Sequence, residues 1–474
     1  MLKLDCGGQG KGAPDKRPER GNKVNLERVK RTILVCERSE TLAMNEYARV
    51  EGPVVLGRKG PSERLVDEPY PQKHAGKITL PGGRHAADVR ALCVAPGGAV
   101  YAATALWLYE VRQSFQPDRP IAELMPEWQP EAKIAVAAPE REIHDVRDVR
   151  VDEAGRVWVC GQTGVFRREA SGWVKVCDPP DGPGIPVVMS VLPAEGRTWV
   201  AASHAGVGWI EGGRFVPLKD QSALPAFVWR LDPGPGGAVW ACGSDGAALI
   251  AAGGDEVRRS IRGVQVRRVL DLGDTAIAAT SRGLLFLAPG GVWGEDRAKE
   301  PVRDVRDVLL GADGSLWAAT SRGVWRRRPD GVVAYFASKR WLPGDDARAV
   351  AEGPDGTIWV ATAGGLAHLA EISSTLEEKA HRFDARIEAR HVRLGGFVTS
   401  SRLLRPGDLS SNVTRPSDND GLWTCMYLAA QSYRYAATGD PDAKAKASRA
   451  YRAVEWLEAV TGIPGFPTKA IVPA

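Results

Sequence analysis

The distribution of apolar and polar positions between Asp88 and Leu369 repeats along the chain. Each copy has a short apolar strand, a glycine turn, a strand opened by a large apolar residue, a second glycine turn and a third strand. The clearest copies are 306–325 and 348–369. Short apolar runs separated by turn residues are typical of β-strands. The pattern therefore predicts an all-β body built from one repeated unit.

The large residue that opens the second strand marks the period of this repeat. The intervals between successive markers are 57, 41, 41, 37, 40 and 42 residues, and the markers are Tyr101, Trp158, Trp199, Trp240, Ile277, Trp317 and Trp359. A unit of about 40 residues with several short strands is one blade of a β-propeller. Seven markers thus predict an all-β seven-bladed propeller, with most marker side chains buried between neighbouring sheets.

The ends of the repeat region predict how the ring closes. The last copy stops after its third strand, and a three-stranded blade would leave an open sheet edge. The segment Lys77–Leu80 precedes the first copy and has the pattern of an outer strand. We expect it to complete the seventh blade. From Glu371 to Arg390 the pattern changes to charges at helical spacing, which predicts a helix.

Two phrases of the repeat carry a family resemblance. ADGSLWAATSRGV at 312–324 and PDGTIWVATAGGL at 354–366 resemble the two-component regulator propeller repeat, in which a turn precedes L-W-[IV]-[GA]-T and a Gly-Leu strand. Ile277 and Gly243 depart from this pattern in two other copies. The resemblance covers residues 77–370. It implies a seven-bladed propeller that serves as the extracytoplasmic sensing part of a larger protein, and it names no ligand.

The chain ends in a helical region. Apolar and aromatic residues on most faces of the segment Leu422–Ala437 predict a helix buried on several sides. After Gly439, Asp440 is expected as the N-cap and Pro441 as the first residue of a second helix over Ala443–Val460. The two helices would form a hairpin.

The start of this hairpin carries a second resemblance. The phrase DNDGLWT at 418–424, with the residues that follow, resembles the first helix pair of an α/α toroid from bacterial multidomain proteins that carry regulator-type propellers. Such toroids often serve carbohydrate-active enzymes. Two helices do not bury such faces alone, so we expect a truncated toroid. Trp423 and Tyr427 are expected in its core rather than as a sugar platform.

These patterns divide the chain into five parts. They are a disordered basic arm at 1–31, an N-terminal extension at 32–76, the propeller at 77–370, a helical connector at 371–400 and the helical hairpin at 401–474. The net charge of the chain is +5, and residues 1–40 hold ten Lys and Arg against six Asp and Glu. The remaining chain is thus close to neutral, which argues against a general nucleic-acid binder.

The composition of the chain limits which cellular compartment and which cofactors we expect for it. No apolar run approaches the roughly 20 residues that a membrane helix needs. No secretory signal peptide is visible. A periplasmic or extracellular location is therefore implied only by the family resemblance, and a cytoplasmic location is the alternative. The 7 cysteines are isolated, which argues against a disulfide framework or a zinc site. We expect no metal and no cofactor, because the histidines have no metal-ligand spacing: His74, His85, His144 and His204.

Arginines recur at the opening of the innermost strands. Eleven residues before the marker, four copies carry Arg90, Arg147, Arg306 and Arg348. Arg267 lies one place off this register, and Arg230 follows a tryptophan at the corresponding point. The turn after the second strand should lie on the same face, and it carries Gln162, His204, Asp245, Arg282 and Arg322. The row predicts a basic channel mouth that binds a small anionic ligand or a glycan.

A structural interpretation competes with this one. Acids stand beside the arginines, and reciprocal ion pairs between blades would use both sets: Asp145, Asp148, Asp304, Asp307, Asp345 and Asp346. In the helical region, Asp418, Asn419 and Asp420 form either a polar site or an N-cap. Both alternatives stay open at the level of sequence.

Two functions follow from these observations. The first is a non-catalytic, sensor-type recognition module of a larger bacterial protein, which binds a ligand or a protein partner at the arginine-bearing face. The second is a fragment of a polysaccharide hydrolase or lyase, with its site between propeller and toroid. No catalytic residues are assigned, because the sequence has no paired acids at a catalytic spacing and no Ser/His/Asp arrangement. That absence favours the recognition module.

Overall fold

A computed structural model gives the structure of the chain. It describes residues 67–78, 80, 87–111, 143, 145–182, 184–194, 196–288, 291–295, 300–404 and 411–472. The chain divides into two compact units, one over Glu68–Glu378 and another that contains Lys379–Ala474. The basic arm predicted at 1–31 lies outside the described residues, and so do His85 and His144.

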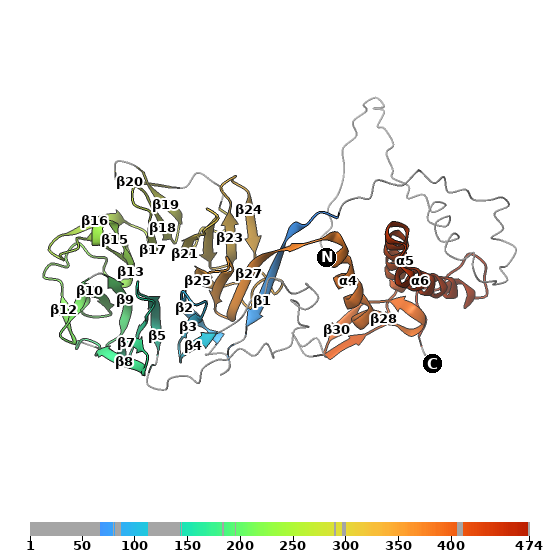
Figure 1. Cartoon of the computed structure of the whole chain (residues 1–474), viewed down its shortest axis with the longest axis horizontal. Helices are drawn as coiled ribbons and strands as arrows, with labels where there is room; N and C mark the ends of the chain where they lie inside the picture. The colour runs from blue at the N-terminus through green and yellow to red at the C-terminus, as the bar shows by residue number, and fades with distance from the viewer. Residues whose placement is uncertain are drawn as a thin grey trace, which may run out of the picture. The chain divides into compact units, whose positions relative to one another are not determined.

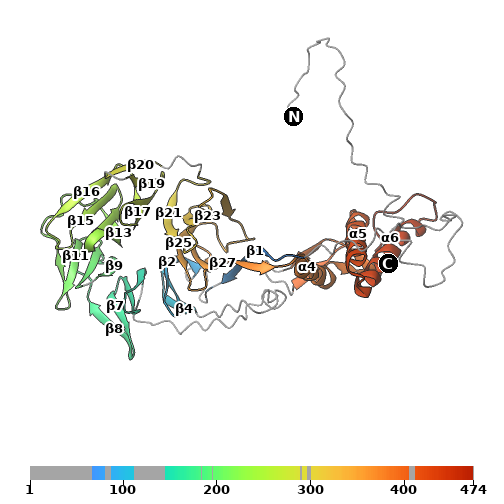
Figure 2. The ribbon, with the colours of Figure 1, turned by 45° about the horizontal axis from the view of Figure 1, so that its top comes forward.

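The first unit is a seven-bladed β-propeller of antiparallel sheets (Figure 1). The first strand of each blade is innermost, and these strands contact one another in cyclic order, with β2 between β25 and β5. Figure 2 shows the same ring from a tilted viewpoint. The prediction of seven blades is therefore confirmed.

The strands of the seven blades follow the chain. Blade one contains β2 (Val89–Val94), β3 (Val100–Thr104) and β4 (Leu108–Val111). Blade two contains β5 (Val146–Val151), β6 (Val157–Gly161), β7 (Gly164–Glu169) and β8 (Gly172–Cys177). Blade three contains β9 (Val188–Ala194), β10 (Arg197–Ala202), β11 (Gly206–Glu211) and β12 (Arg214–Pro217). Blade four contains β13 (Val228–Pro233), β14 (Val239–Gly243), β15 (Gly246–Ile250) and β16 (Val257–Arg262). Blade five contains β17 (Val266–Asp271), β18 (Ala276–Thr280), β19 (Gly283–Ala288) and β20 (Val292–Glu295). Blade six contains β21 (Val305–Leu310), β22 (Leu316–Thr320), β23 (Gly323–Arg327) and β24 (Val333–Phe336). Blade seven contains β25 (Ala347–Glu352), β26 (Ile358–Thr362), β27 (Gly365–Ser374) and β1 (Tyr70–Ile78).

The ring closes where β1 pairs with β27. The predicted closing strand, Lys77–Leu80, lies at this place, but β1 is longer and ends at Ile78. Strand β27 is also longer than predicted and runs to Ser374, because β1 offers it a partner along its whole length. The predicted helix at 371–390 is wrong in its first turn: α4 spans Leu376–Arg390.

The marker side chains form the contacts between blades. All seven are buried, with Trp199 1% exposed and Trp240 2% exposed. Trp199 belongs to one apolar cluster with Val239 and Ala241 of the next blade, as expected for a side chain between two sheets. Burial of a Trp side chain contributes on the order of 3 kcal/mol to the stability of the fold. The structural interpretation of the markers is thus confirmed.

The helical unit contains α5 (Asp420–Thr438) and α6 (Pro441–Ala459). The predicted break holds: the Asp440 carboxylate accepts a hydrogen bond from the amide of Asp442, and Pro441 is the first residue of α6. Tyr427 is buried, as predicted. Trp423 is 40% exposed, so the prediction that it lies in the core is wrong. Short ladders precede the helices: β28 (Val392–Arg393) with β29 (Phe397–Val398), and β30 (Ser401–Leu403) with β31 (Asn412–Thr414). Within the described ranges, no helix has the length and apolar character that crossing a bilayer requires.

Blade seven contains a histidine that should make ring closure sensitive to acid. His368 of β27 lies opposite Gly76 of β1, where a Cβ atom would come within 1.8 Å of the imidazole. Its ring packs against Trp359 with centroids 5.3 Å apart. Burial outweighs the opposing charge of Asp355 and, with a smaller contribution from the nearby His74, lowers the pKa of His368 to about 4.

We predict that the propeller loses roughly 2 kcal/mol of its free energy of unfolding between pH 7 and pH 5 through His368. The unfolded chain takes up a proton near pH 6.5 while the folded chain resists protonation, so this contribution is complete above pH 6.5 and is lost as the pH falls towards 4. Urea unfolding of the intact chain and of His368→Gln measures the difference. An equal loss in the variant would contradict the assignment.

Candidate functional site: the channel mouth

The innermost strand of every blade contains a β-bulge at its second residue. In blade two, Val146 pairs with Gly161 and Asp148 pairs with Cys160, so that Arg147 has no cross-strand partner. The same irregularity occurs in the other six blades. A bulge re-aims the extra side chain. The bulge residues, here called the mouth ring, are Arg90, Arg147, Met189, Trp229, Arg267, Arg306 and Arg348.

We call the residue two places before each bulge the acid position. Where this residue is an aspartate, it forms ion pairs with arginines of the mouth ring. The acid positions are Asp88, Asp145, Val187, Phe227, Gln265, Asp304 and Asp346. Arg90 Nη1 lies 2.7 Å from Asp145 Oδ1 of the next blade, and Arg348 Nη1 lies 2.6 Å from Asp88 Oδ1. Each arginine except Arg147 thus reaches the acid of the following blade.

These contacts form one chain of ion pairs through five blades. Arg306 contacts Asp346 of the next blade and Asp304 of its own, the latter at 3.9 Å. Arg267 begins the chain, with its Nη2 3.4 Å from Asp304 Oδ1. Arg147 ends it, 2.5 Å from Asp145. The predicted ion-pair interpretation is therefore present in the structure, and it uses five arginines and four of the acid-position aspartates.

The mouth ring is apolar where the ion-pair chain stops. Blades three and four carry Val187, Met189, Phe227 and Trp229 at the acid and bulge positions, here called the apolar sector. Trp229 Nε1 donates a hydrogen bond to the carbonyl oxygen of Val266, 2.8 Å away, so it bridges to the next blade as the arginines do elsewhere. The rings of Phe227 and Trp229 have centroids 6.4 Å apart.

A second set of charges lines the innermost strands beyond the bulges. Asp232 is 1% exposed, accepts hydrogen bonds from Arg230 Nε at 2.8 Å and the amide of Val269 at 3.0 Å, and lies 3.5 Å from Arg150. Ser190 Oγ donates to Asp148 at 2.6 Å. This inner charge layer holds three acids and three bases: Asp148, Arg150, Arg230, Asp232, Arg268 and Asp307.

Arg230 and Asp232 of the inner charge layer favour each other's charged forms. Burial lowers the pKa of the Arg230 guanidinium, but the carboxylates of Asp232, Asp307 and Asp148 outweigh it and raise that pKa above its ordinary value. Burial raises the pKa of Asp232, and Arg230, Arg150 and Arg268 together hold it below its usual value. The layer is therefore a compensated charge network at the centre of the propeller.

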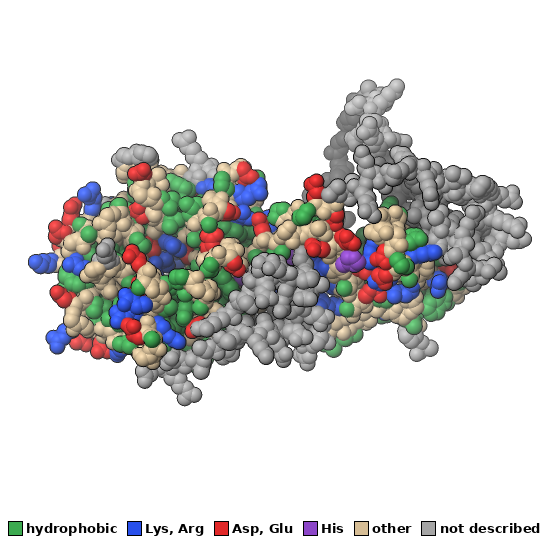
Figure 3. All heavy atoms as spheres, viewed as in Figure 1, with side chains coloured by type: hydrophobic (Ala, Val, Ile, Leu, Met, Phe, Trp, Pro, Cys, Tyr) green, Lys and Arg blue, Asp and Glu red, His purple; other side chains and the backbone are tan. Residues whose placement is uncertain are grey.

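The second predicted set of rim residues lies on the expected face. The amide of Ser281 donates to the carbonyl of Gln265, and that of Ser321 to Asp304, which ties the turn after the second strand to the acid position. The predicted rim side chains in these turns are all exposed: Gln162, His204, Asp245, Arg282 and Arg322. On the face visible in Figure 3, Lys and Arg are interspersed with Asp and Glu over the propeller.

The structure changes one assignment within the arginine row. Arg267 occupies the bulge and belongs to the mouth ring, and its offset from the marker comes from a turn before Ile277 that is one residue shorter. Arg230 does not belong to the ring, because it follows the bulge residue Trp229 and belongs to the inner charge layer. Sequence reasoning missed Met189 and Trp229 as ring members because it searched for one residue type.

The polar residues at the start of α5 do not form an open site. Asp420 is fully buried, contacts Arg393 and accepts a hydrogen bond from Thr399 Oγ1 at 2.6 Å. Asn419 stands at the N-cap but its side chain makes no capping bond, so the predicted N-cap role is wrong. Asp418 is exposed and lies 4.0 Å from Lys469.

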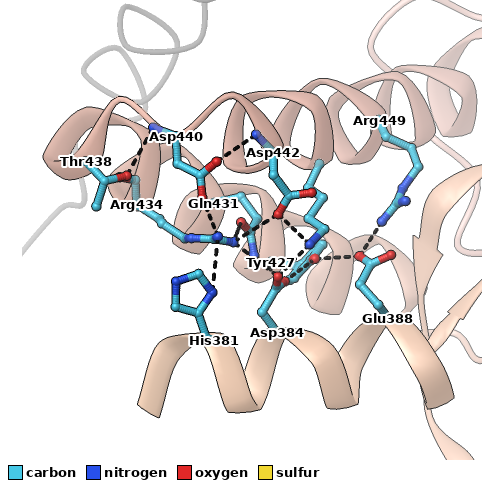
Figure 4. A network of polar contacts seen from close by, with 11 residues as sticks. His381, Asp384, Glu388, Tyr427, Gln431, Arg434, Thr438, Asp440, Asp442 and Arg449 are labelled. Atoms are coloured by element: carbon cyan, nitrogen blue, oxygen red, sulfur yellow. Dashed lines mark hydrogen bonds and ion pairs between the residues drawn. The ribbon is translucent and has the colours of Figure 1, made fainter. Parts of the chain in front are cut away.

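The helical unit has its own polar network (Figure 4). Asp384 of α4 accepts hydrogen bonds from Tyr427 at 2.6 Å, Gln431 at 2.7 Å and Lys446 at 2.6 Å. Burial raises the pKa of Asp384, but the bonds from Lys446 and Tyr427 and the charge of Lys446 bring it below its ordinary value. All these groups are paired, so the network ties α4, α5 and α6 together.

Within the described ranges, no group of three or more His, Cys, Asp and Glu residues could hold a metal ion. The buried thiols do not supply a nucleophile either. Burial raises the pKa of Cys160 and Cys242 well above the ordinary value, and Asp148 or Asp232 nearby adds to the effect.

Comparison with known proteins finds similar solved structures but no family. No family model matches the chain, and no curated protein matches it. A streptogramin B lyase structure has 12% identity and a TM-score of 0.49 over 63% of this chain and 98% of that one. The extracellular domain of a protein described as a hybrid two-component system, from B. thetaiotaomicron, has 15% identity and a TM-score of 0.46 over 62% of this chain and 42% of that one.

The WD40 propeller domain of Doa1 is a third similar structure, with 16% identity and a TM-score of 0.48 over 63% of this chain and 97% of that one. These three proteins differ in what their descriptions say they do. The likenesses therefore carry no argument about the function of this chain. No family model identifies the resemblance to the two-component regulator propeller repeat.

We predict that Asp232→Ala lowers the free energy of unfolding by about 3–5 kcal/mol, because it leaves Arg230 and Arg150 buried without their shared carboxylate. Asp330→Ala is the matched control, since its side chain is 51% exposed and accepts hydrogen bonds from Arg328 and the amide of Val332 at the surface. That change should lower the free energy of unfolding far less, because water screens an exposed ion pair. Urea unfolding measures both, and similar losses would contradict a central role for the inner charge layer.

Proposed function

We propose that this chain is a non-catalytic recognition module, in which a seven-bladed propeller binds a small anionic ligand at the mouth ring. The observation that carries the proposal is the bulge that presents an arginine in five consecutive blades. Guanidinium groups bind carboxylate and phosphate through paired hydrogen bonds. A ring of them held by the scaffold needs little reorganisation when a ligand arrives.

The arginines keep donor capacity beyond their ion pairs. Each guanidinium has five N–H donors. Arg147 and Arg267, at the two ends of the ion-pair chain, each pair with one carboxylate and are 32% and 30% exposed. Arg267 also donates a hydrogen bond to the neutral side chain of Gln265 at 3.3 Å. Burial lowers the pKa of Arg267 more than Asp304 raises it, and Arg306 lowers it further. A bound anion would offset that cost, so the ends of the chain are the best supported contact points.

The acids between the arginines shape what such a site selects. They bring the mouth close to neutrality, so long-range attraction of anions is weak. Recognition then depends on the geometry of the hydrogen bonds rather than on net charge. A ligand with one compact anionic group fits this arrangement better than an extended polyanion does.

The test is anion binding to the intact chain. Isothermal titration with inorganic phosphate and with a galacturonate trisaccharide should show binding that weakens tenfold to about a hundredfold in Arg147→Ala and Arg267→Ala, the loss expected for a charge-assisted hydrogen bond. Arg258→Ala is the control, because this arginine is 75% exposed on the outer strand β16. Thermal unfolding of each variant separates binding from stability.

Two results would overturn the proposal. One is that the intact chain binds neither probe. The other is that Arg258→Ala weakens binding as much as the ring variants do. Loss of thermal stability in the ring variants without any anion binding would assign the arginines to the fold alone.

A second candidate function is part of a polysaccharide-active enzyme, and the surface of α5 favours it. Leu422, Met426 and Tyr433 lie on one face of this helix and are 54%, 58% and 70% exposed. An apolar stripe of this kind is typical of a helix that packs against further helices, as in a toroid. We expect no turnover of anionic or neutral polysaccharides by this chain in a reducing-end assay. Robust turnover would replace the recognition module with the enzyme.

A further inference from the structure

We propose that the ligand of the mouth ring is an organic anion whose charged group is joined to an aromatic ring. The anionic half of this inference rests on the proposed function. The aromatic half rests on the apolar sector, which the arginine row alone did not suggest. The two halves are argued and tested separately.

The apolar sector interrupts the ring at both of its positions. In blades five, six, seven, one and two the bulge residue is arginine, and the acid position is aspartate or glutamine. In blades three and four both positions are apolar: Val187, Met189, Phe227 and Trp229. Met189 and Phe227 replace both partners of the pair that would join blades three and four, whereas Val187 leaves Arg147 with the acid of its own blade. The two blades thus present four apolar side chains at the mouth, here called the apolar arc.

Trp229 is held as a fixed surface within this arc. Its indole N–H is occupied by the carbonyl oxygen of Val266, which orients the ring and leaves only its carbon surface for a ligand. Phe227 lies beside it at an interplanar angle of 51° and is 36% exposed. Two aromatic rings at this separation form a platform on which a third ring packs favourably.

The apolar arc continues to the rim through the loop before β9. A Cβ atom at Gly184 would lie 3.2 Å from His204 Nε2, so this loop stands beside the turn that bears His204. The neighbouring Ile185 is 65% exposed. An exposed aliphatic side chain next to the mouth enlarges the apolar surface that a ligand covers.

The charged and apolar parts meet at one point. Trp229 bridges to Val266, and the next residue in the chain is Arg267, whose contact with Asp304 of the next blade is 3.4 Å long. A ligand with an anionic group directly on an aromatic ring can therefore contact the Arg267 guanidinium and the Trp229–Phe227 pair at once. A pure polyanion would use only the arginine arc, and a neutral aromatic compound only the apolar sector.

The experiment compares methyl phosphate with phenyl phosphate, two monoesters of the same charge. Isothermal titration of the intact chain should show phenyl phosphate binding about tenfold more tightly, as expected for one aromatic contact. Phe227→Ser and Trp229→Ala should each reduce the affinity for phenyl phosphate towards that for methyl phosphate. Phe227→Ser should leave the affinity for methyl phosphate unchanged. Phe466→Ser, at a 64% exposed site in the helical unit, is the matched control and should change nothing.

The outcomes separate this inference from the proposed function. If methyl phosphate binds and phenyl phosphate binds no more tightly, or if Phe227→Ser leaves the preference intact, the aromatic half is wrong and the anion site stands. If neither ester binds, the proposed function fails and this inference fails with it. Should Trp229→Ala prevent folding, Phe227→Ser still decides the question, because Phe227 is partly exposed and its backbone amide keeps its bond to Ser244 Oγ.

Discussion

The arrangement of the mouth depends on a single backbone irregularity, the β-bulge at the second residue of each innermost strand. Without the extra residue, the side chain at that point would alternate with its neighbours and face an adjacent sheet. With it, seven side chains from residues far apart in the sequence converge on one ring. The scaffold fixes the place of each ring member, while the residue type at each place is free to vary. That separation allows charged and apolar parts to share one surface.

The ion-pair chain serves the fold and the site at the same time. An arginine that reaches the acid of the next blade, as Arg348 reaches Asp88, ties neighbouring sheets together at the inner end. The marker residues, such as Trp199, do the same inside the sheets through apolar contact. The two kinds of contact act at different depths. A ligand at the mouth would exchange part of the ion pairing without disturbing the apolar contacts that hold the ring.

The sequence predicted the number of blades and the burial of the markers, because both follow from a period that several independent copies repeat. It placed the closing strand correctly but too short, since the alternation in Tyr70–Ile78 is weak until a partner strand is known. The mouth ring was predicted in part. Spacing from the marker located four ring arginines, and a shortened turn explains the offset of Arg267. Arg230 was included although it lies one place past the register, where Trp229 occupies the bulge. The pairing of charges depends on distances in space, which spacing along the chain does not contain.

The reach of Arg150 has a consequence for how the ring behaves as a repeat protein. Its guanidinium extends from blade two past Ser190 of blade three to the carbonyl of Leu231 in blade four, at 2.7 Å. Repeat arrays normally couple only adjacent units, so their stability is close to a sum over neighbours. A link that skips one unit makes three consecutive sheets cooperative as a group. Duplication or deletion of the middle sheet would break that link, so this part of the ring resists the simplest route by which propellers gain or lose blades.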